Sequence, residues 1–281
     1  MVWVKKHQKF LWGIAAGALA TVLIINRHWF APLHEPTMAV LNSNATTAFM
    51  GAFAGAFVVY FMSWLEKQRS LLADINTATG ELSGLINTLL GFKRQQVLPL
   101  AKNYNDNVQL YNYKASAAEK GLNDAARLQL ALPFLSCSDL HFDLPTDRIY
   151  ANAVGAVKIV PIIAQTKRTM GGIKSAYDLW NQQIEVLKTI KDDAQRAMYY
   201  FGQKDPDGNF NATFHDALSN LVYSVDEGLV LCQLSIDRLH AMAKVELPFW
   251  LKNKVARTEI VDPQSKKLMP PKDSLKGWAD E

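Results

Sequence analysis

Cysteine is scarce in this sequence of 281 residues, which contains only Cys137 and Cys232. Two cysteines so far apart in the chain provide no disulfide framework for the fold. The topology derived below places both of them in the cytoplasm, a reducing compartment. We therefore expect two buried thiols and no disulfide.

Catalytic and metal-binding patterns are also lacking. The sequence has no phosphate-cradling glycine loop followed by Lys-Ser or Lys-Thr, and no nucleophile elbow. Cys137 and His141 offer only two ligands, whereas a zinc site needs about four. The acidic turn that begins at Asp205 has its glycine too early for a calcium loop and lacks the closing glutamate. The six histidines share no ligand spacing: His7, His28, His34, His141, His215 and His240. We therefore expect no catalytic residue, no metal, no cofactor and no enzymatic activity.

An excess of one charge is missing as well. The formal net charge is +4, and basic and acidic residues are interspersed after residue 65. Nucleic-acid-binding domains carry a clustered basic footprint, so we expect no broad nucleic-acid surface. The chain after residue 65 is long enough for one or two soluble domains with a real core.

Formal charge is absent altogether from residues 10–25 and 45–65. As helices at about 1.5 Å per residue, these stretches measure about 24 Å and about 31 Å, against a hydrocarbon core of about 30 Å. Residues 1–65 are therefore predicted to form a transmembrane hairpin, with spans at about 10–28 and 45–65. The alternative is a cleaved signal peptide, because a basic start, an apolar run and Ala18-Leu19-Ala20 loosely fit that pattern.

The orientation of the hairpin follows from its flanking charges. Lys5, Lys6 and Lys9 precede the first span, and Lys67 and Arg69 follow the second. Loops rich in Lys and Arg stay on the cytoplasmic side. We therefore expect a two-span, multi-pass protein of the bacterial inner membrane with both termini in the cytoplasm.

Small residues share one side of each span. Gly13 and Gly17 lie four positions apart on the first span, and Gly51 and Gly55 do so on the second. Such pairs let helix backbones approach closely in lipid. They are predicted to be helix-packing residues, either between the two spans of one chain or between subunits.

An apolar seam continues from the second span into residues 66–100, with a spacing of three and four residues. Sustained over several heptads, this spacing is typical of a helix that supercoils around partners. The seam predicts an unbroken stalk helix without a loop at residues 66–69, and an interface or gate between subunits. The alternative is that the stalk packs on later helices of its own chain. The seam residues are Phe57, Phe61, Trp64, Leu71, Ile75, Leu82, Leu85 and Leu89.

Residues 101–247 are predicted to form a cytoplasmic helical domain. Pro99 should kink or restart the long helix, because proline lacks an amide donor. Residues 149–164 read as one buried soluble helix, since Asn152 and Lys158 disfavour a third span. Apolar stripes of helical period follow over residues 173–201 and again from Asn211 or Thr213. Residues 248–281 are predicted to be an irregular tail, with a short hairpin possible around 258–268. The fold class is therefore all-α.

One basic patch is a candidate anion site. Lys167, Arg168 and Lys174 surround Gly171-Gly172, where we expect a helix break that leaves amide donors free for a phosphate or nucleotide. The alternative is a solvated turn between two helices.

Two functions follow from this layout. The first is a homo-oligomeric channel or pore-type effector controlled by its cytoplasmic domain. The second is a membrane-anchored scaffold or adaptor that conducts no ions. By layout alone, a two-span hairpin joined to a helical domain resembles the membrane-perturbing effectors of bacterial anti-phage systems. The expected partners are the lipid bilayer, further copies of the chain, and an anionic small ligand or a cytoplasmic regulatory protein.

Overall fold

The computed structural model describes residues 44–119, 132–137, 140–202, 213–258 and 262–271. Every regular element in these ranges is helical, which confirms the all-α fold class. The first predicted span, with Gly13 and Gly17, lies outside the described residues. Among the described residues, no helix has both the length and the apolar character needed to cross a membrane.

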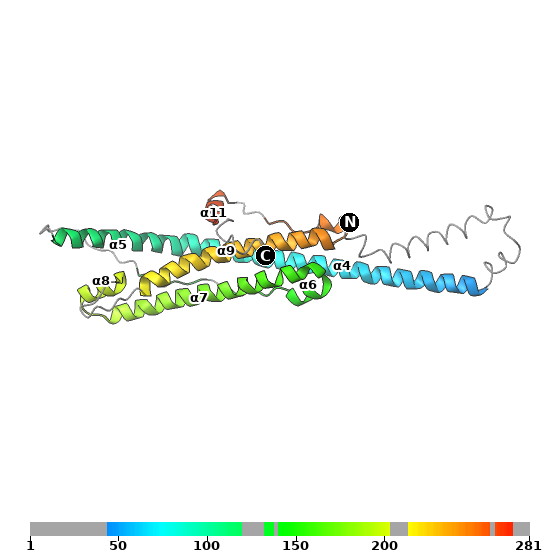
Figure 1. Cartoon of the computed structure of the whole chain (residues 1–281), viewed down its shortest axis with the longest axis horizontal. Coiled ribbons are helices and arrows are strands. Elements are labelled where there is room, and N and C mark those ends of the chain that lie inside the picture. The colour runs from blue at the N-terminus through cyan, green and yellow to red at the C-terminus, as the bar shows by residue number, and fades with distance from the viewer. Residues whose placement is uncertain (1–43, 120–131, 138–139, 203–212, 259–261, 272–281) are drawn as a thin grey trace.

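The longest helix, α4 (Asn44–Phe92), is continuous through residues 66–69, as the seam predicted. Figure 1 shows α4 running out beyond the bundle at one end, while α5 (Leu98–Glu119) extends it at the other. Between them lies η2 (Lys93–Val97), a π-helical turn in which the Leu98 amide donates to the Lys93 carbonyl. This wider turn stands directly before Pro99, whose ring would clash with a regular preceding turn. In place of the predicted kink or restart at Pro99, the chain has this π turn and stays helical through it.

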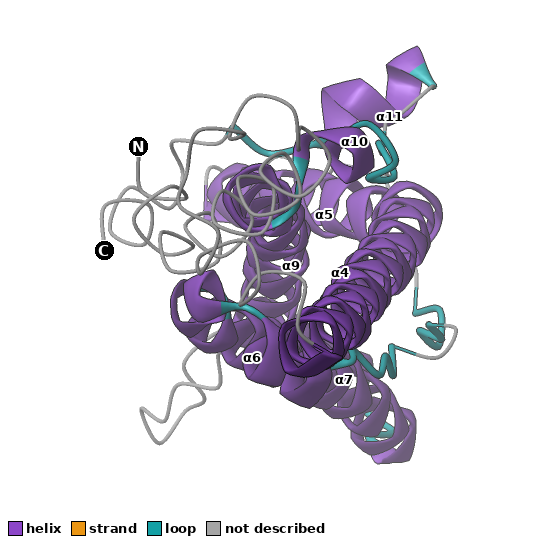
Figure 2. Ribbon diagram, turned by 90° about the vertical axis from the view of Figure 1, so that its right-hand side faces the viewer, coloured by secondary structure: helices purple, strands orange, loops and turns teal. Residues whose placement is uncertain are grey.

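The core lies where α4 packs with α7 (Val160–Thr189) and α9 (Thr213–Glu246). Figure 2 looks along the bundle and shows these helices grouped around a common centre. The predicted stripes face this centre. Helix α9 is described from Thr213 onward, and the choice of Asn211 or Thr213 as its first residue lies outside the described residues. The largest fully buried side chains are Trp180, Tyr200, Phe214, Leu71, Ile75, Leu82, Leu89, Ile173, Ile184, Leu187, Leu221 and Leu229.

The stalk seam belongs to this core, which corrects its assignment as a subunit interface. From Leu71 to Leu89 its side chains are at most 4% exposed and pack within the chain's own bundle. A face buried by intramolecular helices is not available to another subunit. The alternative of an ordinary bundle therefore describes the five residues Leu71, Ile75, Leu82, Leu85 and Leu89.

Residues 149–164 do not form the single helix predicted for them. They divide into α6 (Thr146–Asn152), η3 (Val154–Lys158) and the first turn of α7. Pro161 stands in that first turn, where its fixed backbone angle suits a helix start and its missing amide costs nothing. The apolar residues of this segment divide between two sides, with Ile149 and Ala156 buried and Val154 and Val157 exposed.

The helix break expected at Gly171-Gly172 is also wrong. Helix α7 passes through both glycines without interruption. Two glycines weaken a helix by about 1 kcal/mol each relative to alanine, whereas full burial of a side chain such as the neighbouring Ile173 stabilises by about 1.5–3 kcal/mol. Tertiary packing therefore overrides the local preference.

Short helices and packed connections complete the fold. Helix α8 (Asp193–Phe201) follows α7. The described residues between 132 and 145 form an irregular connector, as expected. It is fixed by Trp180, whose Nε1 donates to the Pro133 carbonyl at 3.1 Å, and by Asn181, which bonds both the amide and the carbonyl of Leu135.

The carboxyl-terminal segment contains α10 (Phe249–Lys252) and α11 (Pro263–Leu268). Helix α11 occupies most of the region in which a hairpin was considered possible, so that suggestion is wrong. Asp262 explains the helix, because its carboxylate accepts from the amides of Gln264 and Ser265. Pro263 follows at the first helical position, where proline is favoured.

Candidate functional site

The half of α4 that projects from the bundle carries exposed apolar side chains. Val58 is 57% exposed and Val59 69% exposed, and Phe53, Tyr60 and Met62 are exposed as well. Among the described side chains of α4, that of Gln68 is the first to be buried. Residues 51–63 are therefore an apolar surface that the described part of the chain leaves open, and we call it the apolar arm.

The predicted helix-packing glycines lie on this arm. A Cβ atom added at Gly51 or Gly55 would meet no described atom within 4 Å. The described residues therefore supply no helix that packs against this small-residue face. Its predicted role in helix packing stays a prediction.

An aromatic ladder connects the apolar arm to the bundle. The rings of Phe57 and Phe61 are stacked with centroids 6.4 Å apart, and Phe61 and Trp64 follow at 5.8 Å. Trp64 meets Trp250 of α10 edge to face at 6.2 Å. These three α4 aromatics are the part of the predicted seam that lies outside the core, and they are half-buried.

The π turn η2 is a joint for three other segments. Lys93 lies 2.6 Å from the Asp226 carboxylate of α9 and donates to the Leu268 carbonyl at 2.6 Å. Gln96 exchanges two hydrogen bonds with the backbone of Ser136 in the connector. No sequence motif marks this joint. The kink expected at Pro99 is the one signal that points to it.

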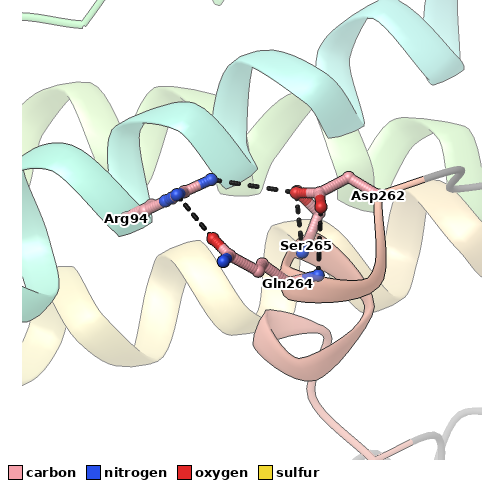
Figure 3. Close-up of polar contacts among 4 residues, drawn as sticks. All are labelled: Arg94, Asp262, Gln264 and Ser265. Atoms are coloured by element: carbon pink, nitrogen blue, oxygen red, sulfur yellow. Dashed lines mark hydrogen bonds and ion pairs between the residues drawn. The ribbon is translucent and has the colours of Figure 1, made fainter.

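Arg94 fastens α11 to the same turn. Figure 3 shows its guanidinium reaching Gln264, to which it donates at 2.6 Å, and the Asp262 carboxylate at 3.7 Å. The Ser265 hydroxyl donates to Asp262, and this bond, with the amides of Gln264 and Ser265 and the charge of Arg94, lowers the pKa of the Asp262 carboxyl. The ionised form of Asp262 therefore caps α11 and holds it beside η2.

A second attachment fixes the chain after α10. Asn76 of α4 donates to the Lys254 carbonyl at 3.1 Å and accepts from the Ala256 amide at 2.8 Å. His240 of α9 bonds the Ala256 carbonyl at 2.9 Å. The segment predicted as an irregular tail is thus tied to two core helices.

Two of the three residues of the predicted anion site line one groove on α7. Lys167 and Lys174 line a groove of about 470 Å³ together with connector residues 137 and 140–142. The Lys167 ammonium lies 5.9 Å from the centre of the Phe142 ring. Arg168 is exposed on α7 but is not among the lining residues. Because α7 is continuous, it does not offer the free amide donors expected at Gly171-Gly172, and anion binding here stays a prediction.

Another cavity of about 530 Å³ opens between α5, α9 and residues 270–271. Tyr104, His215 and Asp226 line it. Burial raises the pKa of the Tyr104 hydroxyl, and the charge of Asp216 adds to that effect. A phenol with a raised pKa stays protonated and does not serve as a nucleophile at neutral pH.

Within the described ranges, no group of three or more His, Cys, Asp or Glu side chains is arranged to hold a metal ion. The comparison with known proteins gives no precedent for either cavity or for the apolar arm. No family model, curated protein or solved structure matches this chain. Its own residues are therefore the only ground for a function.

Both cysteines are free thiols, as predicted, although Cys137 is only half-buried while Cys232 is fully buried. Burial raises the pKa of Cys137 to about 11 and that of Cys232 to about 12. Only the thiolate is nucleophilic. Neither cysteine is therefore activated for catalysis.

Proposed function

We propose that this chain is a membrane-anchored helical-bundle protein that presents its bundle on the cytoplasmic face of a bilayer. The observation that carries the proposal is the apolar arm, where large hydrophobic side chains stand exposed on a helix that continues into the bundle. Contiguous exposed apolar surface marks a site of contact with membrane or protein.

Lipid is the environment that best matches the arm. In the sequence, residues 45–65 are free of formal charge and about 31 Å long as a helix, which fits the hydrocarbon core. The proposed span takes in residues 45–50, most of whose side chains lie outside the description, as well as the apolar arm. Residues 10–28 would form the other half of the hairpin.

The proposed orientation rests on Lys67 and Arg69, which are exposed directly after the span. By the positive-inside rule they keep the bundle in the cytoplasm, and Lys5, Lys6 and Lys9 do the same for the amino terminus. In a bacterium the membrane would be the inner membrane. The groove beside Lys167 and Lys174 would then face the cytoplasm, where an anionic small ligand or a regulatory protein has access to it.

An extraction experiment tests the membrane anchor. Membranes that contain the full chain are washed with alkaline carbonate, and the chain is expected to stay in the pellet. Recovery in the supernatant would contradict the anchor.

A pair of variants tests the role of the apolar arm. Val58→Asp with Val59→Asp places two charges on the arm and should reduce membrane recovery, because aspartate at the centre of a membrane helix costs about 3 kcal/mol per residue. Thr77→Asp with Asn87→Asp adds the same charges at exposed positions of α4 within the bundle and should leave recovery unchanged. Equal recovery of the two variants would refute the assignment of the arm to lipid.

The second candidate function is a homo-oligomeric channel-type effector of bacterial anti-phage defence. Its support is the open face at Gly51 and Gly55 and the ladder of Phe57, Phe61 and Trp64, which would pack between copies in lipid and narrow a pore. Dye or ion flux across liposomes that hold the purified chain tests it. Flux that is lost in Gly51→Leu with Gly55→Leu would favour the channel, whereas silence of the unaltered chain favours the scaffold.

A further inference from the structure

We infer that the end of the bundle from which α4 emerges is itself a lipid-binding surface, which rests on the anionic headgroup layer beside the anchor. This end surface comprises residues 64–69, 150–158 and 244–252. The inference rests on the membrane anchoring proposed above, but it concerns residues that lie outside both predicted spans.

The end surface carries large apolar side chains in solvent-exposed positions. Phe249 is 76% exposed and Val154 71% exposed. Val157 and Val245 are each 61% exposed, and Tyr150 is 58% exposed. They come from three helices, α6, η3 and α10, and from the last turn of α9. Several elements therefore contribute exposed apolar side chains to this end of the bundle.

The fold holds these side chains outward at α10. Leu247 and Leu251 are buried, and Pro248 between them has an extended backbone. The chain therefore turns so that its leucines enter the core while Phe249 and Trp250 stay outside. A helix that served only to close the bundle would have no need of aromatic side chains at these two positions.

Contacts between segments unite the end surface. The Gly155 amide of η3 donates to the Glu246 carboxylate of α9 at 3.1 Å, and a Cβ at Gly155 would lie 3.3 Å from Met242. Trp250 contacts Trp64 at the point where α4 leaves the bundle. Helix α6 packs on α4, and Figures 1 and 2 show it beside α4 at this same end.

The charges of the end surface suit anionic lipid. Its three segments contain five cations and only two acids, Glu66 and Glu246, and Glu246 is engaged by Gly155. Basic side chains next to a membrane are each attracted to anionic headgroups by about 1 kcal/mol. The exposed cations are Lys67, Arg69, Lys158, Lys244 and Lys252.

Continuity with the apolar arm favours lipid over a second copy of the chain. The arm begins at the same residues that border the end surface, so a bilayer that holds the arm brings its headgroups to this end. Tryptophan, phenylalanine and lysine together are the side chains typical of the membrane interface. A protein partner would need no such ring of cations around the point where the anchor enters lipid.

Spin labels on the full chain test the inference. The chain carries Cys137→Ser, keeps the buried Cys232, and is reconstituted in bilayers with and without anionic lipid. A nitroxide is placed at Phe249→Cys or Val157→Cys, and its collision rates with oxygen and with a water-soluble nickel complex are measured. In anionic bilayers the oxygen-to-nickel ratio at both sites should be several-fold above that at Val186→Cys, an exposed valine of α7 outside the end surface.

Each outcome separates the end surface from the anchor. A raised ratio at 249 and 157 that falls in neutral bilayers supports the inference. Water-like ratios at both sites, in a chain that still resists carbonate extraction, overturn the inference and leave the anchor standing. Loss of access to both reagents means that protein covers the surface, which also overturns it. Release of the chain by carbonate removes the anchor itself.

Discussion

The polar side chains that matter most in this protein are those that tie distant segments to a single turn. Lys93 is 8% exposed and meets the carboxylate of Asp226 and the carbonyl of Leu268, whereas its neighbour Arg94 makes its contacts in solvent. The contribution of an ion pair to the free energy of unfolding depends on its burial. Water screens an exposed pair, whereas removal of one partner from a buried pair leaves a charge that is strongly destabilising. Two adjacent basic residues therefore have unequal roles.

Substitution of these two neighbours should show the difference. Lys93→Met leaves Asp226 without its partner and should lower the free energy of unfolding by about 1–3 kcal/mol. Arg94→Met loses only exposed contacts and should cost about 0–1 kcal/mol. Urea unfolding of the two variants in the same detergent measures both values. If both variants lose the same free energy of unfolding, the burial of Lys93 does not increase its contribution to stability.

The thiol of Cys137 should react with an unusual pH dependence. Its pKa is raised by burial to about 11, so the thiolate fraction grows about tenfold for each pH unit between pH 8 and 10. An ordinary thiol approaches its plateau in that interval. Labelling rates with a maleimide or a disulfide reagent provide the measurement. A plateau near pH 9 would contradict the burial of this group, and Cys137→Ser should abolish the reaction, since Cys232 is accessible only after unfolding.

At the scale of helices, the glycines fall into two groups, those on an open helix surface and those at a close contact between helices. Gly171 and Gly172 lie in the middle of α7, and a Cβ added at either would meet no atom of the described residues within 4 Å. Gly228 of α9 lies where α4, α7 and α9 meet, and its Cβ would be 2.7 Å from Met170 and 3.3 Å from both Ile173 and Leu89. The first two are helix-weakening residues without a packing role, and the third permits close contact of three helices.

Alanine substitution should have opposite effects at these positions. Gly172→Ala should raise the free energy of unfolding by about 0.5–1 kcal/mol, because alanine loses less backbone entropy in a helix. Gly228→Ala gains the same backbone-entropy term, but its methyl group overpacks the core, which destabilises by about 1–3 kcal/mol. The free energy of unfolding should therefore fall. Thermal unfolding of both variants gives the comparison. If Gly228→Ala stabilises the protein, the neighbouring side chains can repack around the added methyl group without cost.

Helix α11 depends on the ionised carboxylate of Asp262. The lowered pKa of this group means that the folded helix favours the charged form, so its contribution is complete above about pH 4 and is lost as the pH falls through the lowered value. Amide exchange at Gln264 and Ser265 should therefore accelerate at acid pH. Asp262→Ala should cause the same acceleration at neutral pH, whereas Asp262→Asn, a good cap without charge, should cause much less. Exchange that is equally slow in all three proteins would contradict the capping role.

These elements show what the sequence could predict. The helical stripes of α7 and α9 and the continuity of α4 follow from apolar spacing, which is a local signal. The partner of a stripe is not local. The seam from Leu71 to Leu89 has the same spacing whether it meets another subunit or its own chain, and only the fold places α9 against it.

The candidate sites were harder to predict for the same reason. The groove at Lys167 exists because the connector lies across α7, and the joint at η2 exists because segments far apart in the chain meet Lys93, Arg94 and Gln96. Neither requires residues close together in the sequence. The apolar arm was predictable, because its property is a run of side chains and needs no partner.

At the scale of the whole molecule, α4 belongs to two environments. One face of the helix from Gln68 onward belongs to the core, and residues 51–63 form the apolar arm. Since helix α4 is unbroken between them, the direction of the arm is fixed relative to the bundle. The end surface at α6, η3 and α10 is useful only if that direction is held.

The rigidity of α4 leads to the last prediction. Spin labels at Val58→Cys and Asn87→Cys, both exposed, span 29 residues of one helix in the Cys137→Ser background and should show a narrow distance distribution centred at about 44 Å. Lys67→Pro should broaden and shorten this distribution, because proline inside a helix removes a hydrogen bond and kinks the axis. Lys67→Ala is the matched control, since Lys67 is exposed and alanine continues the helix, and it should match the parent. A broad distribution in the parent itself would mean that the arm swings freely on the bundle, and the end surface would then have no fixed relation to the membrane.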